Sequence, residues 1–214
     1  MWIASYPRSG SSLLRLILKQ VFGLRSTSLY EGEIARWDIA PGMADLVGHY
    51  ERGRRNGAHE QKDVEFIKTN EPPLDEAPAI YLVRDGRSAI VSYFHYLNGI
   101  QGLPATLEEL IHGEIFPGFW ADHYKAWRPR ERPRTLFLRY EDLKGAPKEA
   151  CNRIADFIGK PPMRDFTLTF AELHERFPAY FRCGHDERNI SEIEPHQKLF
   201  DSIHGDVMRE LGYY

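Results

Sequence analysis

The chain has 214 residues, of which 42% are hydrophobic and 28% are charged. This length and composition favour one folded domain and exclude both a disordered chain and a fibrous repeat. The 28 basic and 31 acidic residues leave a formal net charge of −3, which argues against nucleic-acid coating, so any anion site must be local. The two cysteines give neither a disulfide framework nor a metal-ligand pattern, and no apolar stretch has membrane-spanning length. We therefore expect a cytoplasmic protein without a metal site.

In chain order, short apolar runs alternate with runs of helical periodicity. Strands are expected at residues 2–6, 64–69, 79–83 and 135–139, and helices at residues 11–22, 86–96, 107–112, 120–127, 147–158 and 197–211. This alternation predicts an α/β sandwich built on a parallel sheet, with a ligand site beyond the carboxyl ends of the strands. Residues 24–62 lack clear periodicity and contain several glycines, which indicates a partly helical lid.

The first candidate site is the segment Tyr6-Pro7-Arg8-Ser9-Gly10-Ser11-Ser12, between the first strand and the first helix; we call it the 6–12 loop. Backbone N–H groups at a helix start, serine hydroxyls and a guanidinium can together surround a phosphate or a sulfate. The segment is not a Walker A loop, because its first glycine is missing and an arginine precedes Gly10 where a lysine should follow it. The alternative interpretation is an ordinary helix cap beside a surface arginine.

The second candidate site follows the strand at residues 79–83. Arg84 stands at the carboxyl end of that strand, and Ser92 lies two turns into the next helix, so both could reach one phosphate. The alternative is a local ion pair between Arg84 and Asp85, with Ser92 as an ordinary helix residue. Two such motifs in one chain favour two neighbouring anion sites.

Together these segments resemble the sulfotransferases that use 3′-phosphoadenosine 5′-phosphosulfate (PAPS). The 6–12 loop is similar to that family's 5′-phosphosulfate loop, and Arg84 with Ser92 is similar to its 3′-phosphate pair. Three looser similarities are Tyr140 in the segment 136–143, the pair Thr169-Phe170 beside the adenine, and Arg182-Cys183-Gly184 as a reduced Arg-Lys-Gly loop. The last of these would close on the 3′-phosphate.

The resemblance implies a three-layer sandwich with a central parallel sheet flanked by helices, similar to P-loop NTPases. It implies a single sulfotransferase domain over residues 1–214, with residues 24–62 as a lid and acceptor-binding segment. The donor would be PAPS, the acceptor a small molecule or a glycan carrying a hydroxyl, phenol or amine, and the product adenosine 3′,5′-bisphosphate (PAP). No metal, nucleic acid or membrane is implied, and the oligomeric state stays open.

The implied catalytic residues are Arg8, Lys68, Asn70, Glu71 and Ser92. The implied donor-binding residues are Arg8, Ser9, Gly10, Ser11, Ser12, Arg84, Ser92, Tyr140, Thr169, Phe170, Arg182 and Gly184. Arg8 and Lys68 would neutralise charge on the transferred group, since sulfuryl transfer, like phosphoryl transfer, depends on in-line positioning and charge stabilisation.

The catalytic base is an open question. Asn70 stands where many of these enzymes have a histidine, and a carboxamide cannot accept the acceptor's proton. Glu71 is one candidate, although neighbours on an extended chain point to opposite sides. A histidine from elsewhere is the second, with His49, His59 and His95 as the possibilities, and a chain without any base is the third. If the base is missing, Asn70→His should raise turnover.

Two other functions remain as alternatives. One is a degenerate P-loop nucleotide kinase, against which the missing Walker lysine weighs. The other is a non-catalytic nucleotide-binding module that has lost its base.

Overall fold

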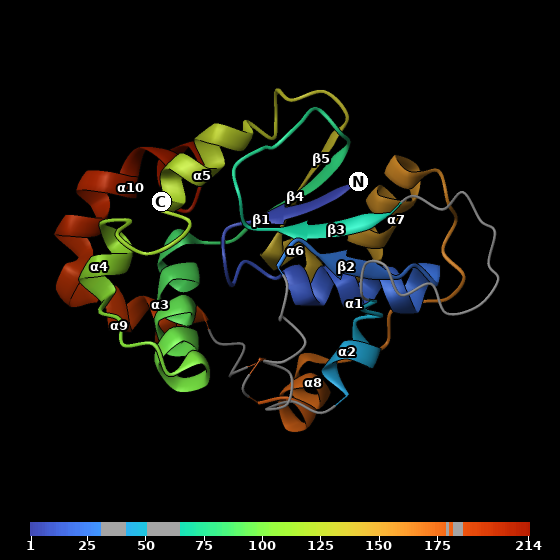
Figure 1. Ribbon diagram of the computed structural model, residues 1–214, viewed down its shortest axis with the longest axis horizontal. Coiled ribbons are helices and arrows are strands. Elements are labelled where there is room, and N and C mark those ends of the chain that lie inside the picture. Colours follow the sequence, from blue (N-terminus) through green and yellow to red (C-terminus); the bar gives the residue numbers. More distant parts are fainter. Residues whose placement is uncertain (31–41, 51–64, 179, 182–185) are drawn as a thin grey trace.

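The computed structural model describes residues 1–30, 42–50, 65–178, 180–181 and 186–214, and in this part of the chain five parallel strands form one sheet in the order β2-β3-β1-β4-β5 (Figure 1). The strands are β1 (Trp2–Ser5), β2 (Ser26–Ser28), β3 (Phe66–Thr69), β4 (Ala79–Val83) and β5 (Thr135–Arg139). Each strand pairs in parallel with its neighbours, with Ile3 opposite Lys68 on one side and Ile80 on the other.

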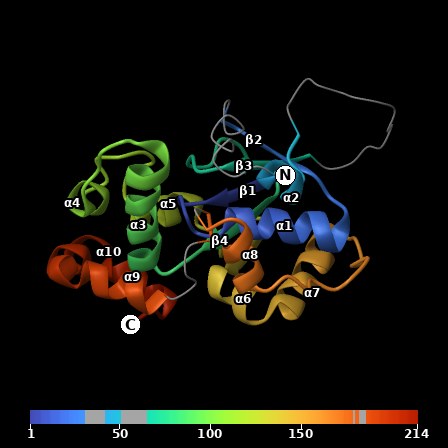
Figure 2. The same cartoon turned by 90° about the horizontal axis from the view of Figure 1, so that it is seen from below.

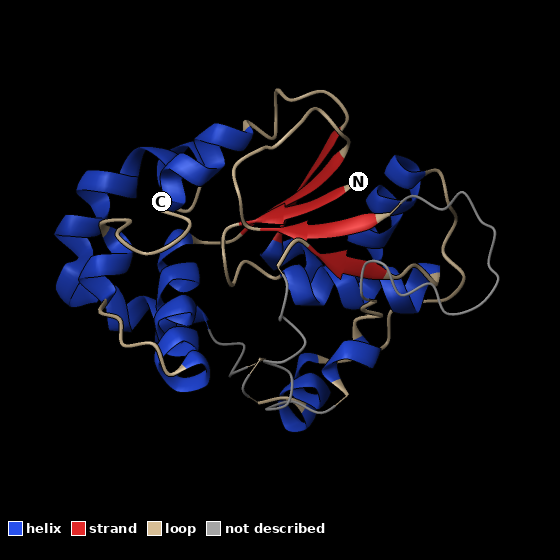
Figure 3. Ribbon diagram, viewed as in Figure 1, coloured by secondary structure: helices blue, strands red, loops and turns tan. Residues whose placement is uncertain are grey.

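Helices connect these strands and cover both faces of the sheet (Figures 2 and 3). They are α1 (Ser11–Phe22), α2 (Met43–Leu46), α3 (Gly86–Tyr96), α4 (Leu107–Ile111), α5 (Trp120–Trp127), α6 (Tyr140–Gly145), α7 (Pro147–Ile158), α8 (Phe170–Arg176), α9 (Asp186–Ile193) and α10 (Gln197–Leu211). A π-helical turn, Leu97–Gln101, extends α3. Within the described residues no helix is both long enough and apolar enough to cross a bilayer.

Alternate residues of the strands serve two separate hydrophobic cores. Ile3, Ile80 and Leu82 face a core that contains residues of α1, α6 and α7. Trp2 and Tyr81 face the opposite core, which contains residues of α3, α5 and α10. Because both faces are covered, the central strand β4 is a continuous apolar run rather than an alternation of apolar and polar residues. The three-layer arrangement expected from the sequence is confirmed.

Most of the expected elements are confirmed, and β2, α6, α8 and α9 were missed. The helix at residues 86–96 and the strands at residues 79–83 and 135–139 have the bounds that the sequence predicted. β2 lies inside the segment 24–62, so the beginning of the expected lid belongs to the sheet. α6, which starts at Tyr140, and α8 were not predicted. Acidic residues in the first turn of both helices favour these starts through the helix dipole.

The carboxyl ends of the central strands define one edge of the sheet. The chain passes from β1 into the 6–12 loop, from β3 to Asn70, from β4 to Arg84 and from β5 to Tyr140. β1 lies between β3 and β4, so the strand order reverses direction at β1. In open parallel sheets, a crevice forms beyond the carboxyl ends of the strands at such a switch point. The sheet order therefore brings segments distant in sequence to one place.

Candidate functional site

A cavity of about 710 Å³ lies at this edge of the sheet, within the size range of small-molecule sites. Its walls come from the 6–12 loop, from the ends of β3 and β4, from α3 and its π-helical turn, and from residues near α6, α8 and α9. The lining residues that the argument uses are Arg8, Gly10, Ser11, Ser12, Tyr30, Lys68, Asn70, Glu71, Arg84, Ser92, Tyr96, Tyr140, Phe170 and Tyr180.

The 6–12 loop presents the start of α1 to the cavity. Gly10 is the N-cap with φ of 102°, and no side chain caps the helix. The first turn contains no acidic residue, and the hydroxyls of Ser11 and Ser12 stand beside its backbone N–H groups. The first N–H groups of a helix lack intrahelical acceptors and carry the positive end of the helix dipole, so this turn suits an anion.

Gly10 is required here by space as well as by backbone conformation. A Cβ atom at this position would lie 2.5 Å from Cδ2 of Tyr140, which begins α6 and lines the cavity. The loop and the Tyr140 ring are therefore in direct contact, and the ring also lies under the guanidinium of Arg84 at 4.5 Å.

Two arginines meet on this side of the cavity. Nη1 of Arg84 donates to the backbone carbonyl of Arg8 at 3.2 Å, and Arg84 is only 7% exposed. Arg8 has the uncommon φ of 65°. Burial lowers the pKa of Arg8, and the charge of Arg84 lowers it further, while Tyr96 acts in the opposite direction. Two like charges held together in a partly buried site favour an anionic ligand.

Ser92 joins the same cluster from α3. It is 6% exposed, and its Oγ accepts a hydrogen bond from Nε of Arg8 at 3.2 Å. The start of α3 is fixed by Asp85, which accepts from the backbone N–H of Arg87 and binds the Arg87 guanidinium at 2.6 Å. Asp85 thus serves Arg87 and the helix start rather than Arg84, which removes the local ion pair that was the alternative interpretation.

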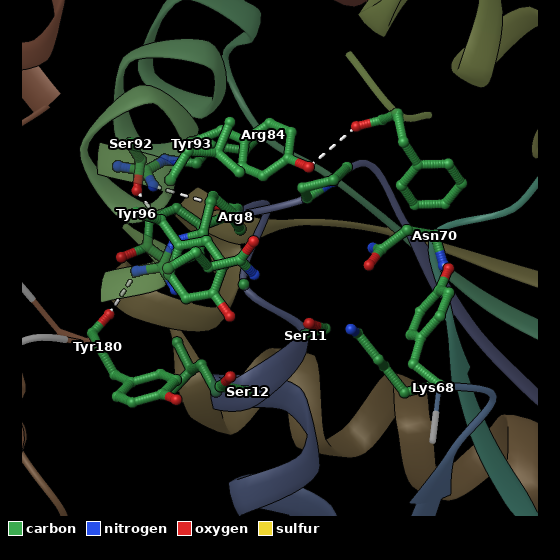
Figure 4. Close-up of a pocket in the computed structure, with 18 of the residues that line it drawn as sticks. Arg8, Ser11, Ser12, Lys68, Asn70, Arg84, Ser92, Tyr93, Tyr96 and Tyr180 are labelled. Atoms are coloured by element: carbon green, nitrogen blue, oxygen red, sulfur yellow. Dashed lines mark hydrogen bonds between the residues drawn. The ribbon is translucent and has the colours of Figure 1, made fainter. Parts of the chain in front are cut away.

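Lys68 approaches from the opposite wall. It is the third residue of β3, and its Nζ lies 4.7 Å from the centre of the Tyr30 ring. Figure 4 shows Lys68 and Asn70 on one side of the cavity and Arg8, Ser92, Tyr96 and Tyr180 on the other, with Ser11 between them. The site thus has two cationic regions on either side of the helix start.

Asn70 and Glu71 both line the cavity. The Asn70 amide nitrogen donates to the carbonyl of Ser5 at 2.6 Å, and its backbone N–H donates to the hydroxyl of Tyr30 at 2.7 Å. Glu71 follows in a bend, and its backbone N–H donates to Oγ1 of Thr69 at 3.0 Å. Because the chain bends after β3, the strict alternation of an extended strand does not separate Asn70 from Glu71.

The histidines considered as bases have other neighbours in the structure. Nδ1 of His49 lies 2.8 Å from Nη2 of Arg15, and Nε2 of His95 binds Glu192 at 2.5 Å; neither histidine lines the cavity. His59 lies outside the described residues. The structure therefore brings Glu71, but neither His49 nor His95, to the cavity.

The remaining expected donor residues divide into three groups. Tyr140 and Phe170 line the cavity. Ser9 and Thr169 are not among the lining residues. Ser9 is fully buried, and Thr169 is the N-cap of α8, where it forms a capping box with Glu172. Arg182 and Gly184 lie outside the described residues.

Sequence reasoning missed the aromatic lining residues Tyr30, Phe116 and Tyr180. Tyr96 stacks with Tyr93 at 6.4 Å, Tyr180 meets Tyr96 edge to face, and Tyr30 meets Phe116 in the same way. No motif marks Tyr30, Phe116 or Tyr180, since each is a single aromatic residue in a different segment. The capping pattern Thr-x-x-Glu at Thr169 could have revealed α8.

The fold and the cavity define an α/β protein with a pocket lined by cationic side chains at the carboxyl edge of a parallel sheet. Residues 1–175 match the sulfotransferase domain family, so the chain belongs to that family. Mouse sulfotransferase 1B1 is 32% identical over 180 residues, which are 74% of this chain and 58% of the relative. Guinea pig 3-alpha-hydroxysteroid sulfotransferase is 27% identical over 186 residues, 78% of this chain and 62% of the relative.

Two solved structures share the fold at low identity. Mouse sulfotransferase SULT7A1 complexed with PAP has a TM-score of 0.68 at 21% identity, covering 100% of this chain and 87% of that one. Retinol dehydratase in a complex with retinol and PAP has a TM-score of 0.66 at 22% identity, covering 97% and 80%. The chain thus spans about 60% of the length of these two curated relatives and shares the P-loop-like fold of its structural neighbours.

Proposed function

We propose that the protein transfers a sulfuryl group from PAPS to the hydroxyl of a small apolar acceptor and releases PAP. The observation that carries this proposal is the convergence of an uncapped helix start with two cationic regions on one cavity, Arg8 and Arg84 on one side and Lys68 on the other. A donor with a phosphate at one end and a phosphosulfate at the other needs two separate anion positions. The PAP complexes of the two structural neighbours support the same donor.

Lys68 and the start of α1 would act at the end where transfer occurs. This end must adjoin the acceptor and its base. Lys68 and Asn70 share that wall, and Glu71 follows Asn70 in the chain and also lines the cavity. An ammonium and several N–H groups stabilise the charge that develops on the departing phosphate oxygen as its bond to sulfur breaks. No proton donor is needed for a phosphate leaving group.

Glu71 would be the catalytic base. Glu71 is among the residues that line the cavity, whereas the amide nitrogen of Asn70 already donates to the Ser5 carbonyl. In the reaction, the acceptor O–H proton passes to Glu71 as the acceptor oxygen forms its bond to sulfur. This proposal replaces the histidine of the resembled enzymes with a neighbouring carboxylate.

The acceptor end of the cavity favours an apolar compound over a glycan. Leu29, Tyr30, Leu97, Leu103 and Phe116 line it, and Leu103 and Phe116 are about half exposed at 54% and 46%. Apolar and aromatic walls gain binding energy from burial of apolar area, of which a glycan has little.

We keep the cytoplasmic location expected from the sequence as part of this proposal.

Thermal melting with PAP, compared with ATP and Mg²⁺, tests the donor. A ligand at one hundred times its Kd adds about 2.7 kcal/mol of stability. For a chain of this length that corresponds to a rise in Tm of roughly 5–10 °C.

Transfer from radiolabelled PAPS to a panel of phenols and hydroxysteroids tests the reaction. A response to ATP and Mg²⁺ alone would support the kinase, and PAP binding without any transfer would support the non-catalytic module.

A further inference from the structure

A buried tryptophan of α5 contacts the backbone of Glu71 from inside the protein. Trp127 is the last residue of α5, and its indole Nε1–H donates to the backbone carbonyl of Glu71 at 2.9 Å. Trp127 is only 1% exposed and is not among the residues that line the cavity. The bond therefore fixes a lining residue from a position that no substrate in the cavity would touch.

The bond to Trp127 completes the fixation of the backbone at Glu71. The N–H of Glu71 donates to Oγ1 of Thr69 at 3.0 Å, and its carbonyl accepts from Trp127. Both peptide planes beside the Glu71 Cα atom are thus held, and the following Pro72 disfavours a helical backbone at Glu71. Because two fixed peptide planes set the direction of the Cα–Cβ bond, they set where the Glu71 side chain begins.

The indole of Trp127 is itself held firmly. The Arg132 guanidinium lies 5.2 Å from the centre of its ring, and the Tyr81 ring lies 5.9 Å away on a buried strand. Nη2 of Arg132 also donates to the carbonyls of Asp75 at 2.7 Å and Ala77 at 2.8 Å. The end of α5 and the loop between β3 and β4 therefore form one connected group of contacts.

A second ring of α5 lies beside the same peptides. His123 is 3% exposed, its Nδ1 lies 3.0 Å from the Tyr81 hydroxyl, and its buried Nε2 has no hydrogen-bond partner within the described residues. Burial lowers the pKa of His123 to about 4, and backbone groups of Asn70 and Glu71 act in the opposite direction, as groups close to the imidazole do. Of these two rings, only Trp127 makes a hydrogen bond to the bend within the described part of the chain.

We propose that Trp127 is a positioning residue for Glu71: its hydrogen bond places the Glu71 carboxylate where it can take the acceptor's proton. The inference rests on the proposed function, in which Glu71 is the base. A base must come within about 2.6–3.2 Å of the atom whose proton it takes. Since misplacement by about 1 Å can cost a hundredfold in rate, loss of the bond should slow proton transfer without weakening donor binding.

The test removes the indole N–H but keeps a buried aromatic ring, in Trp127→Phe. The matched control is Trp2→Phe, because Trp2 is 8% exposed and its Nε1 donates to the Asp75 carboxylate at 2.7 Å. The control thus loses the same kind of bond to the same loop, away from Glu71. Trp127→His, which keeps a ring N–H, is a second variant. Circular dichroism and calorimetry verify that each variant is folded.

Two acceptor probes separate positioning of a base from general damage to the fold. 4-Ethylphenol ionises at about pH 10, as tyrosine does, so it needs a base. 4-Nitrophenol ionises near neutral pH because its nitro group delocalises the phenolate charge. At a pH between the two values it is largely ionised and needs no base. Single-turnover transfer from radiolabelled PAPS measures the chemical step apart from product release, and titration gives the Kd of PAP.

We expect Trp127→Phe to slow transfer to 4-ethylphenol by about tenfold and transfer to 4-nitrophenol by less than about twofold. The Kd of PAP should stay within about twofold, and Trp127→His should fall between Trp127→Phe and the wild type. Trp2→Phe should lose a similar amount of stability without slowing either transfer. In a Glu71→Gln background, Trp127→Phe should slow transfer to 4-ethylphenol by less than about a further twofold, because the carboxylate that it positions is gone.

Several results would overturn the inference. Equal slowing with both phenols, an unchanged rate with 4-ethylphenol, or a full additional loss in the Glu71→Gln background would leave Trp127 with a structural role only and the proposed function intact. Undiminished transfer by Glu71→Gln would remove the base together with its positioning residue. A wild type that transfers to neither phenol would also overturn the inference, and the PAP-induced rise in Tm would then show separately whether the proposed donor site survives.

Discussion

Gly10 allows a sharp test of how the 6–12 loop is built. Its φ is 102°, and an added Cβ would lie 2.5 Å from Cδ2 of Tyr140 and 3.1 Å from Cδ2 of Leu82. In Gly10→Ala the left-handed backbone costs about 1 kcal/mol. Overlap with a packed ring adds about 2 kcal/mol, since Tyr140 is only 6% exposed and has little room to move. The expected loss of stability is therefore about 3 kcal/mol.

For a chain of this length such a loss lowers Tm by roughly 10 °C, which calorimetry measures directly. Because Tyr140 lines the cavity, the rise in Tm that PAP produces should also fall. The matched control is Gly159→Ala at the end of α7, where φ is 66° and nothing lies within 4 Å of the added Cβ. This control retains only the backbone cost of about 1 kcal/mol. Equal loss in the two variants would refute the argument that Gly10 is set by contact with Tyr140.

Three further predictions concern the reaction and the effect of pH. Glu71→Gln should lower kcat by about a hundredfold or more while leaving the PAP-induced rise in Tm unchanged, and undiminished kcat would exclude Glu71 as base. Adding Asn70→His to that variant should restore part of the lost turnover, because an imidazole would then stand at the same wall. Burial lowers the pKa of both His123 and His204 to about 4, below the ordinary value near 6.5. Since the unfolded chain binds those protons first, stability should fall as the pH drops from about 6.5 to 4, and a Tm independent of pH over that range would contradict this.

The positions of most strands and helices along the chain were predictable, because burial leaves a local pattern in the sequence. α7 buries Ala150, Cys151 and Ile154 with helical spacing, and β4 is five consecutive buried residues. Such patterns report how a segment meets the core, which is a property of neighbouring residues. The three-residue strand β2 escaped prediction because its residues, Ser-Thr-Ser, carry no apolar signal. Its place is set instead by pairing with β3 and by a 2.8 Å hydrogen bond from Nε of Arg15 to Ser26.

The sequence by itself determined the α/β class, the strand–loop–helix at the start of the chain, and the cationic residues Arg8, Lys68 and Arg84 that we propose as anion-binding groups. Only the tertiary structure decided where these groups lie relative to one another. The sheet order places the ends of β1, β3 and β4 side by side, which brings Ser92 within 3.2 Å of a residue 84 positions earlier in the chain. Directions of side chains across a crevice depend on backbone angles such as the φ of 65° at Arg8, and on contacts between distant segments, neither of which leaves a local pattern in the sequence.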